Sequence, residues 1–543
     1  MKRGLLKNFL ALTLIFGTIS ACNLEYFQDA EFGDFVWDPS LAIPVGEITY
    51  TIEELFEELN DVGAQVGANS DNIVSINYTE ALQSQRASIF LAVLDQNFNG
   101  NIQAGVNINN PGVGSTVSLN QTFEYDIEQR SGEEYDSLFF TGGAFALDFT
   151  SQIDATVDFT MTVRSLREKA TGNPLVVTGT LSPTSPNFNF NNTLGDYDGL
   201  FTQDAAGNTS TNKIVMDFAY DITVEPTTVI NSSDQVGFSV SLTDAEFQTV
   251  FGDIGTSALD VNFEVVNLDF FDNFNADRIR FAEPVIQFDF ANSFGFPLGV
   301  DFRDISAISP IGEIVPLTGA AIDNPTIVGA PTVDNIGVVV NSQLELNSTN
   351  SNIADLLEIQ PNKMILQVNA ESNPATGPAQ YNFVDINSIL DVSVNIELPI
   401  IANIENLLFE ENLDFNNGTD LEEAKRLLLR VITENELPLG GDIEIEFLDA
   451  QNNVVFTVSE RPVFTGAPVG TDGRTTEVTT TTVDVNFQDA DIRAIEGATQ
   501  IRVLARLSTT DAQSRAEVRF FQDYELKVRL AAQADVEIGA SGN

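Results

Sequence analysis

The side chains that could carry chemistry in this 543-residue chain are almost all carboxylates and hydroxyls. The chain has no histidine and a single cysteine, Cys22, but 79 aspartates and glutamates. Without histidine there is no imidazole metal ligand, no usual general base near neutral pH and no His-assisted nucleophile. Paired carboxylates can hydrolyse glycosidic bonds, but the sequence does not show which two would meet. Because it also has no phosphate loop or nucleophile elbow, we predict that the protein is not an enzyme.

One segment has the spacing of metal ligands. Asp95, Asn97 and Asn99, followed by Gly100, match the opening of a calcium-binding loop. Such a loop ends in a bidentate glutamate at its twelfth position, where this chain has Val106. The flanking segments have the composition of strands, so a hairpin turn explains the run better than a metal site. We therefore expect neither a metal ion nor a non-covalent cofactor.

The charge of the chain restricts its partners. The formal net charge is −54, and the pI is about 4.1. Nucleic acids need a basic surface, so the sequence predicts no nucleic-acid binding. Solubility is the simpler explanation of the acidity, and a surface that depends on divalent cations is the alternative.

The residues before Cys22 have the layout of a secretory signal: a basic start, the apolar run 9–16 and small residues up to Ala21. The apolar run is too short to span a bilayer comfortably. The tetrad Ile19-Ser20-Ala21-Cys22 resembles the lipobox of bacterial lipoproteins. That resemblance implies cleavage between Ala21 and Cys22, a diacylglycerol on the Cys22 thiol and an acyl chain on the new amino terminus. The membrane would then be a partner through this lipid anchor.

Two later segments also resemble a known group. The runs 288–302 and 428–449 are similar to elements of large uncharacterised outer-membrane lipoproteins of Bacteroidota. This resemblance implies a β-rich lipoprotein anchored in the outer membrane, on its periplasmic or cell-surface side, and it implies no activity. Asp136-Ser137-Leu138 resembles the short glycosylation site of that group, which would make Ser137 an attachment site.

Apolar and polar residues alternate with period two along much of the chain, and this pattern predicts antiparallel strands with one buried face. The buried positions are rich in phenylalanine, which favours sheets packed on sheets. The clearest of these segments are 145–149, 157–163, 286–290, 443–447, 483–487 and 524–530. We therefore expect an all-β protein with few short helices, built as β-sandwiches or elongated curved sheets in two or more domains.

The expected organisation starts with a signal peptide at 1–21 and a tether at 22–40. A β-rich amino-terminal region at 41–330 and a β-rich carboxy-terminal domain at 331–543 follow. Helical spacing predicts short helices at 52–60 and 352–358, and the polar stretch 182–212 is expected to be a long loop.

The chain also contains a weak internal similarity. A helix followed by a strand occurs at 52–78 and again at 353–368, and a strand ending in an Asn-to-Pro-Leu step occurs at 288–298 and at 427–439. Duplication would explain these pairs. Alternatively, asparagine and proline simply mark strand ends.

These observations favour a lipid-anchored surface protein that binds or scaffolds a partner, either a protein or a glycan at the cell surface. Two alternatives stay open. One is a carrier of apolar ligands, with a groove lined by phenylalanine. The other is a carboxylate-based glycan hydrolase.

Overall fold

The structure is a computed structural model of the whole chain. It describes residues 36–37, 40–52, 64–87, 94–109, 115–129, 132–224, 228–259, 264–268, 271, 276–375, 381–414, 424–536 and 538–539. The predicted signal, with Ala21 and Cys22, lies outside this part of the chain.

The described part is all-β, as predicted, and its strands pair in antiparallel sheets. The period-two pattern explains why. In β8 (Glu134–Ser151), Phe145, Leu147 and Phe149 are buried, whereas the residues between them face outward. Alternation of this kind gives each strand one apolar face, and two such sheets bury those faces against each other.

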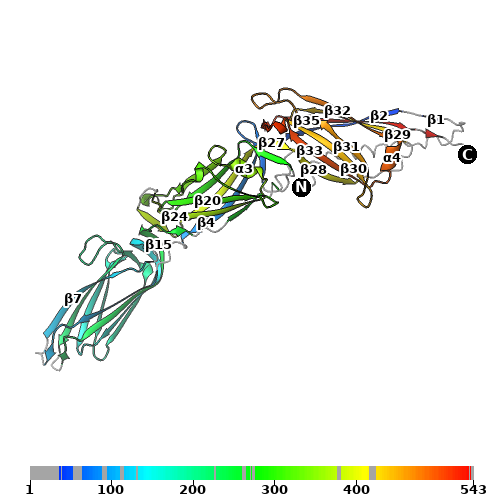
Figure 1. Cartoon of the computed structure of the whole chain (residues 1–543). Helices are drawn as coiled ribbons and strands as arrows, with labels where there is room; N and C mark the ends of the chain where they lie inside the picture. The colour runs from blue at the N-terminus through cyan, green and yellow to red at the C-terminus, as the bar shows by residue number, and fades with distance from the viewer. Residues whose placement is uncertain are drawn as a thin grey trace.

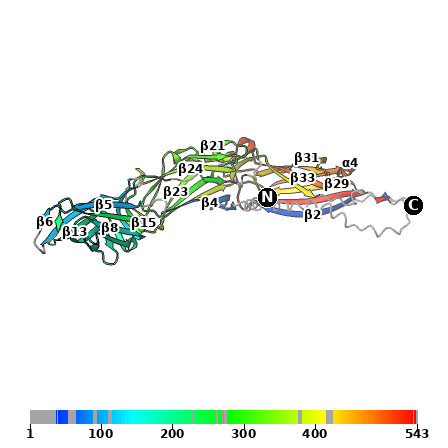
Figure 2. The same cartoon turned by 90° about the horizontal axis from the view of Figure 1, so that it is seen from below.

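The described residues form three lobes in a row (Figure 1 and Figure 2). The distal lobe comprises residues within 94–257. The middle lobe combines 64–87 with 258–400, and the terminal lobe combines 40–52 with 401–536. The two-residue strands β1 (Val36–Trp37) and β36 (Ile538–Gly539) pair at the far end of the terminal lobe.

All three lobes have the same strand order. When the eight strand positions of each lobe are numbered along its described residues, positions 6-3-8-1 form one sheet and positions 2-7-4-5 form the other. This order is that of the jelly roll, a double-sheet sandwich built from two Greek keys. The chain therefore repeats one topology three times.

In the distal lobe, β12 (Tyr197–Leu200) bridges the two sheets by pairing with both β8 and β9. The eight positions are occupied in order by β5 (Gln96–Gln103), β7 (Ser115–Asp126), β8, β9 (Thr156–Glu168), β10 (Pro174–Leu181), β11 (Asn187–Thr193), β13 (Lys213–Val224) and β15 (Gln235–Asp253).

In the middle lobe, two positions are each divided between two short strands, and β3 (Gln65–Ala68) extends the first sheet. The positions are occupied in order by β4 (Val74–Arg86), β16 (Ala258–Leu259) with β17 (Glu264–Asn267), β19 (Val285–Asn292), β20 (Leu298–Ile308), β21 (Ile314–Pro316) with β22 (Thr326–Val328), β23 (Val340–Asn347), β24 (Lys363–Ser372) and β26 (Ile389–Pro399).

In the terminal lobe, the positions are occupied in order by β2 (Ser40–Thr51), β28 (Leu407–Asp414), β29 (Ala424–Asn435), β30 (Leu439–Leu448), β31 (Val454–Phe464), β32 (Thr479–Gln488), β33 (Gln500–Thr509) and β35 (Glu525–Val536). A helix joins positions 6 and 7 in two lobes: α3 (Ile353–Glu358) in the middle lobe and α4 (Asp489–Ile495) in the terminal lobe. The equivalent segment of the distal lobe begins with the 3-10 turn η5 (Leu194–Asp196).

The lobes are nested inside one another. The connection between positions 1 and 2 of the terminal lobe contains the whole middle lobe, and the same connection of the middle lobe contains the whole distal lobe. At each junction between two lobes, the lobe that carries the insertion supplies a short strand from its connection between positions 7 and 8. β25 (Asn382–Asp385) pairs with the end of β15, and β34 (Val518–Arg519) pairs with β27 (Ile401–Glu405).

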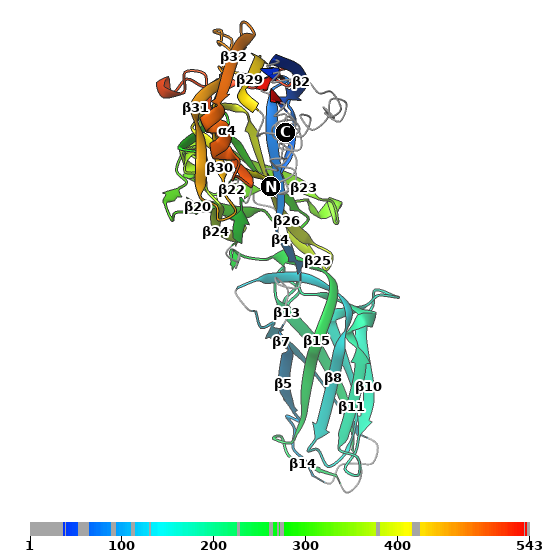
Figure 3. The same cartoon turned by 90° about the vertical axis from the view of Figure 1, so that its right-hand side faces the viewer.

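β27 also pairs with β18 (Arg278–Phe281) of the middle lobe. At the free tip of the distal lobe, labelled β14 in Figure 3, the same arrangement persists without an inserted lobe. There β14 (Val229–Ile230) pairs with β6 (Ile108–Asn109), which lies in the connection between positions 1 and 2. The free tip of the distal lobe is therefore equivalent to the end of the middle lobe that carries the distal lobe, and to the end of the terminal lobe that carries the middle lobe.

Phenylalanine fills the interior of the distal lobe. The Phe149 ring lies 4.3 Å from the Phe159 ring and 5.3 Å from the Phe218 ring, measured between centroids. All three side chains are at most 3% exposed. The core of buried side chains continues through the middle lobe to its junction with the terminal lobe, which has a second core of its own.

The strand pairing differs from the expected organisation in two places. β23 begins after residue 331 but pairs with β19, so a sheet crosses the expected division at 330/331. The expected loop at 182–212 contains β11 and β12. The helix predicted at 352–358 is present as α3, whereas most of the one predicted at 52–60 lies outside the described residues.

Candidate functional site

The residues singled out from sequence do not come together. Cys22 and Ala21 lie outside the described residues. Lipidation of Cys22 and cleavage between Ala21 and Cys22 therefore stay predictions. Ser137 lies within β8, where it pairs with Leu200 of β12 and Phe251 of β15, and its side chain is half-buried. Its role as a glycosylation site stays a prediction as well.

The hairpin turn expected at Asp95–Gly100 is wrong, because the strand β5 begins at Gln96 and continues through Gly100 to Gln103. Asn97 and Asn99 occupy successive outward positions of that strand, and extended backbone carries their oxygens apart instead of around one point. Asp95 accepts a hydrogen bond of 3.0 Å from the backbone N–H of Asp244. Among the described residues, no cluster of three or more Asp, Glu, His or Cys side chains could hold a metal ion.

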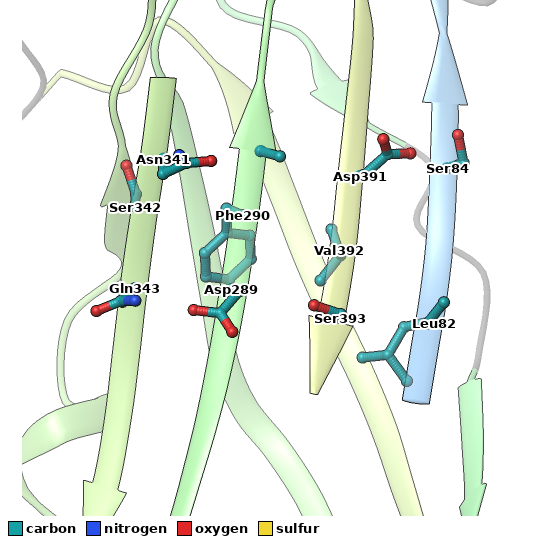
Figure 4. A pocket seen from close by; sticks show the side chains of 12 residues that line it. Leu82, Ser84, Asp289, Phe290, Asn341, Ser342, Gln343, Asp391, Val392 and Ser393 are labelled. Atoms are coloured by element: carbon teal, nitrogen blue, oxygen red, sulfur yellow. The ribbon is translucent and has the colours of Figure 1, made fainter. Parts of the chain in front are cut away.

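The best candidate site is a shallow trough on the outer face of the middle lobe, which we call the middle trough. It has a volume of about 650 Å³ and crosses four neighbouring strands, β23, β19, β26 and β4. The polar side chains on its outer face, shown in Figure 4, are Ser84, Asp289, Asn341, Gln343, Asp391 and Ser393. Ser342 also lines the trough, and its hydroxyl accepts a hydrogen bond of 2.9 Å from the backbone N–H of Gly329.

Strand register explains how these side chains meet. Asp289 lies opposite Gln343 on one side and Ser393 on the other. Two residues further along β19, Ala291 lies opposite Asn341 on one side and Asp391 on the other. All these positions have the same parity, so they share the outer face, while Phe290 points into the core and is 2% exposed. The small side chain of Ala291 leaves the space that deepens the trough.

Hydrogen bonding divides this sheet face into a closed part and an open part. In the closed part, Asp289 accepts hydrogen bonds from the amides of Gln287, at 2.7 Å, and of Asn395. Asn395 in turn accepts one of 2.7 Å from the Thr79 hydroxyl. These groups satisfy one another, so they need no ligand.

In the open part, the side chains of Asp391, Asn341 and Gln343 have no hydrogen-bond partner among the described residues, and neither do the hydroxyls of Ser84 and Ser393. Asp391, Asn341, Gln343 and Ser84 are exposed. Within the trough lining there is no lysine or arginine to neutralise Asp391. The open part can therefore donate and accept hydrogen bonds.

A second, smaller trough of about 320 Å³ lies on the outer face of the distal lobe, across β7, β13 and β9, and we call it the distal trough. Its carboxylate is already paired. Arg164 contacts both oxygens of Asp217, at 2.5 and 2.7 Å, and the Thr122 hydroxyl donates a hydrogen bond of 2.8 Å to the same carboxylate. The distal trough thus lacks the free carboxylate of the middle trough.

Sequence reasoning missed the middle trough because its residues come from segments far apart in the chain. β4 and β26 pair through Ser84 and Asp391, although the whole distal lobe lies between them. The only local signal is the alternation of Asp289 and Ala291 with buried phenylalanines, which shows that these residues face outward.

Comparisons with known proteins do not identify the chain. No family model matches it, and no curated protein is similar to it. Among solved structures, a protein of Parabacteroides distasonis described as secreted is 11% identical, with a TM-score of 0.25, covering 91% of this chain and 99% of its own. A structure of infectious bursal disease virus, Gx strain, is 10% identical, with a TM-score of 0.14, covering 89% and 86%. Such scores are too low to support an argument about function.

Proposed function

We propose that this protein is a lipid-anchored lipoprotein of a bacterial outer membrane that presents its distal lobe away from the bilayer. It would work by binding or scaffolding a partner and not by catalysis. The lipid would be a diacylglycerol and an acyl chain on Cys22. The acidic composition argues against a nucleic-acid partner.

The observation that carries this proposal is the position of the amino-terminal strands within the row of lobes. β1 and its partner β36 lie at one end, and the distal lobe lies at the other (Figure 1). Cys22 precedes Val36 by 14 residues, which can reach at most about 50 Å. A lipid on Cys22 would therefore keep the terminal lobe near the membrane. No helix of the described residues is long and apolar enough to cross it.

The packing of phenylalanine gives the carrier alternative no support. The rings that would line an apolar groove pack against one another inside the distal lobe, as in the pair Phe159 and Phe188, whose centroids lie 5.1 Å apart. The hydrolase alternative needs a pair of carboxylates flanking a bound glycan. In the middle trough, Asp289 is engaged by two amides, so one free carboxylate is left.

Metabolic labelling with a fatty acid tests the anchor. The native chain should take up label, and Cys22→Ala should not. Ser20→Ala serves as the matched control, since it keeps a small residue beside the cleavage site and should still be labelled. An unlabelled native chain would reject the anchor.

Energy transfer to acceptor lipids tests the orientation of the lipidated chain in vesicles. A dye on Ala206→Cys, in an exposed turn of the distal lobe, should transfer much less energy than a dye on Gln451→Cys, in an exposed turn of the terminal lobe. Equal transfer from the two sites would contradict the proposed orientation while leaving the anchor intact.

A further inference from the structure

The middle trough brings together five hydrogen-bonding side chains that have no partner in the part of the chain that the structure describes, and this set limits what could bind there. A ligand would meet the Asp391 carboxylate, two side-chain amides and two hydroxyls, from Asn341, Gln343, Ser84 and Ser393. We infer that the middle trough binds the hydroxyl groups of a neutral carbohydrate. This inference goes beyond the proposed function, because it assigns a ligand class to a site that does not depend on the lipid anchor.

The charges of the trough exclude acidic ligands. Asp289 and Asp391 both lie in it, no cationic side chain lines it, and the chain as a whole is strongly negative. A second carboxylate or a phosphate would be repelled at short range and would find no cation to pair with. A neutral ligand avoids this repulsion.

The polarity of the trough argues against an apolar ligand or a protein partner. Its apolar lining consists of Ala81, Leu82, Ala291 and Val392, none of them aromatic, since Phe290 points inward. Centres of protein interfaces are enriched in aromatic side chains, methionine and arginine, and none of these is exposed in this trough. Its volume falls within the roughly 300–1,000 Å³ typical of small-ligand sites.

Sugar hydroxyls match the groups that remain. A carboxylate accepts from two hydroxyls at once, and a side-chain amide both donates and accepts. Hydrogen bonds to an ionised carboxylate are roughly twice as strong as those between neutral groups, so Asp391 should contribute most. Within the described lining no aromatic ring is exposed for a sugar face to stack on, so binding should be weak, and tests need high ligand concentrations.

The closed part of the same face indicates where the ligand would stop. Beyond Asp289, the side chains of Gln287, Asn395 and Thr79 are satisfied by one another. A ligand would have to break these hydrogen bonds to extend in that direction. The carbohydrate should therefore lie across β23, β19, β26 and β4, from the level of Asp391 to that of Asp289.

Calorimetry with the full chain in detergent, after screening on an array of neutral oligosaccharides (gluco-, manno- and xylo-oligomers), tests the inference. At least one neutral oligomer should bind, and galacturonate oligomers should not. Asp391→Asn should weaken binding by about tenfold. Ala291→Leu should abolish it by filling the trough, and because that side chain points outward, the thermal unfolding curve should be retained.

Glu397→Gln is the matched control, since it removes a carboxylate from the same face of the same strand, six residues from Asp391. It should leave the affinity unchanged within a factor of two. Three results would each overturn the inference: no binding of any neutral oligomer, equal binding of galacturonate oligomers, or equal loss in Asp391→Asn and Glu397→Gln. None of them depends on whether Cys22 carries a lipid.

Discussion

The distal and middle lobes have the same strand order, yet their troughs lie on different sheets, across positions 2, 7 and 4 in the distal lobe and across positions 6, 3, 8 and 1 in the middle lobe, and their side chains differ. In the distal trough, Arg164 and Thr122 neutralise and satisfy Asp217. In the middle trough, Asp391 has neither a cationic partner nor a hydrogen bond within the described residues. The inward residues of each strand build the sandwich, so the outward residues are free to differ. The shared topology therefore says little about binding, and the outward side chains carry that information.

The two lobes also differ in how the chain builds them. The distal lobe is one continuous segment, whereas the middle lobe takes its position 1, β4, from before that segment and the other positions from after it. A continuous sandwich can close its own sheets. A divided one needs a strand that arrives from a distant part of the chain.

The largest expected effect comes from expressing the lobes separately. Residues 94–257 should fold alone and unfold cooperatively. Residues 264–400 should not, because they lack β4, which pairs with β26 along its length and brings the buried side chains Val74 and Ile76. Circular dichroism during thermal unfolding would measure both. Cooperative unfolding of 264–400 would show that the divided lobe does not depend on its distant strand.

A smaller effect should come from removing a buried asparagine that occurs at the equivalent position of the middle lobe and of the terminal lobe. The Asn292 amide donates to the carbonyls of Phe296 and Gly329, at 3.2 and 2.9 Å, and Asn435 makes the equivalent bonds of 2.8 Å to Leu439 and Thr465. Both side chains are fully buried. Asn292→Ala and Asn435→Ala should each lower the free energy of unfolding of their own lobe by about 2–4 kcal/mol, since buried carbonyls lose their donors.

The distal lobe provides the comparison for that pair. There the Ser151 hydroxyl accepts a single hydrogen bond of 3.1 Å, from the backbone N–H of Ile153. Ser151→Ala should cost only about 1 kcal/mol. Hydrogen exchange resolved by peptide would assign each loss to its lobe. Losses as small for the asparagine variants as for the serine variant would contradict the larger contribution expected of the two buried amides, and unequal losses for Asn292→Ala and Asn435→Ala would contradict their equivalence.

The junction between the distal and middle lobes should weaken in acid. Burial raises the pKa of Asp385, but hydrogen bonds from the Asn387 backbone and from Gln248 and Thr249 outweigh it, so the pKa lies below its ordinary value of 3.8. A lowered pKa stabilises the folded form above the ordinary pKa. The stabilisation that ionised Asp385 gives to the folded form is lost as the pH falls below 3.8 and then through the lower pKa that Asp385 has in the folded protein.

Pepsin cleavage between pH 4.5 and pH 2.5, a range chosen to span roughly this titration, would measure the effect. Cleavage near β25 should increase as the pH falls. Asp385→Asn should remove this dependence, and β34, at the junction of the middle and terminal lobes, serves as the internal comparison. A parallel increase at both junctions would assign the acid effect to general unfolding.

The smallest expected effect is the loss of the ion pair in the distal trough. Arg164 and Asp217 have side chains 40% and 35% exposed, so water screens their attraction. Arg164→Gln should lower the free energy of unfolding by about 1 kcal/mol or less, and high salt should reduce the difference. Arg164→Lys keeps the charge but loses the two-point contact. Its free energy of unfolding should therefore lie between those of the native chain and of Arg164→Gln. A loss that salt does not change would point to packing instead of charge.

Local patterns predicted the strands well and their partners poorly. The alternation at 145–149 and 286–290 identified β8 and β19, because a strand with one buried face shows period two wherever it lies. The alternation of asparagine and phenylalanine at 187–191 is equally regular, yet the prolines and glycines around it led us to expect a loop. Half-buried edge strands such as β11 carry a weaker apolar signal than central ones.

The internal similarity was predicted partly correctly. The Asn-to-Pro-Leu steps connect the ends of β19 and β29, at Asn292 and Asn435, to the starts of β20 and β30, at Leu298 and Leu439, and these strands occupy equivalent positions in two lobes. The other expected pair was wrong, because the counterpart of α3 is α4 and not a helix near residue 52. The third copy was not expected at all, since the distal lobe shares the strand order without this sequence step.

The sequence alone determined that the chain forms antiparallel sheets with phenylalanine inside and an acidic exterior, because these properties depend on residue type and on spacing within single strands. Only the tertiary structure decided that three sandwiches are nested, and which outward side chains meet in the middle trough. Thr79 and Asn395 share a hydrogen bond although 316 positions separate them. Contacts over such separations depend on strand register and lobe insertion, which no local pattern of residues encodes.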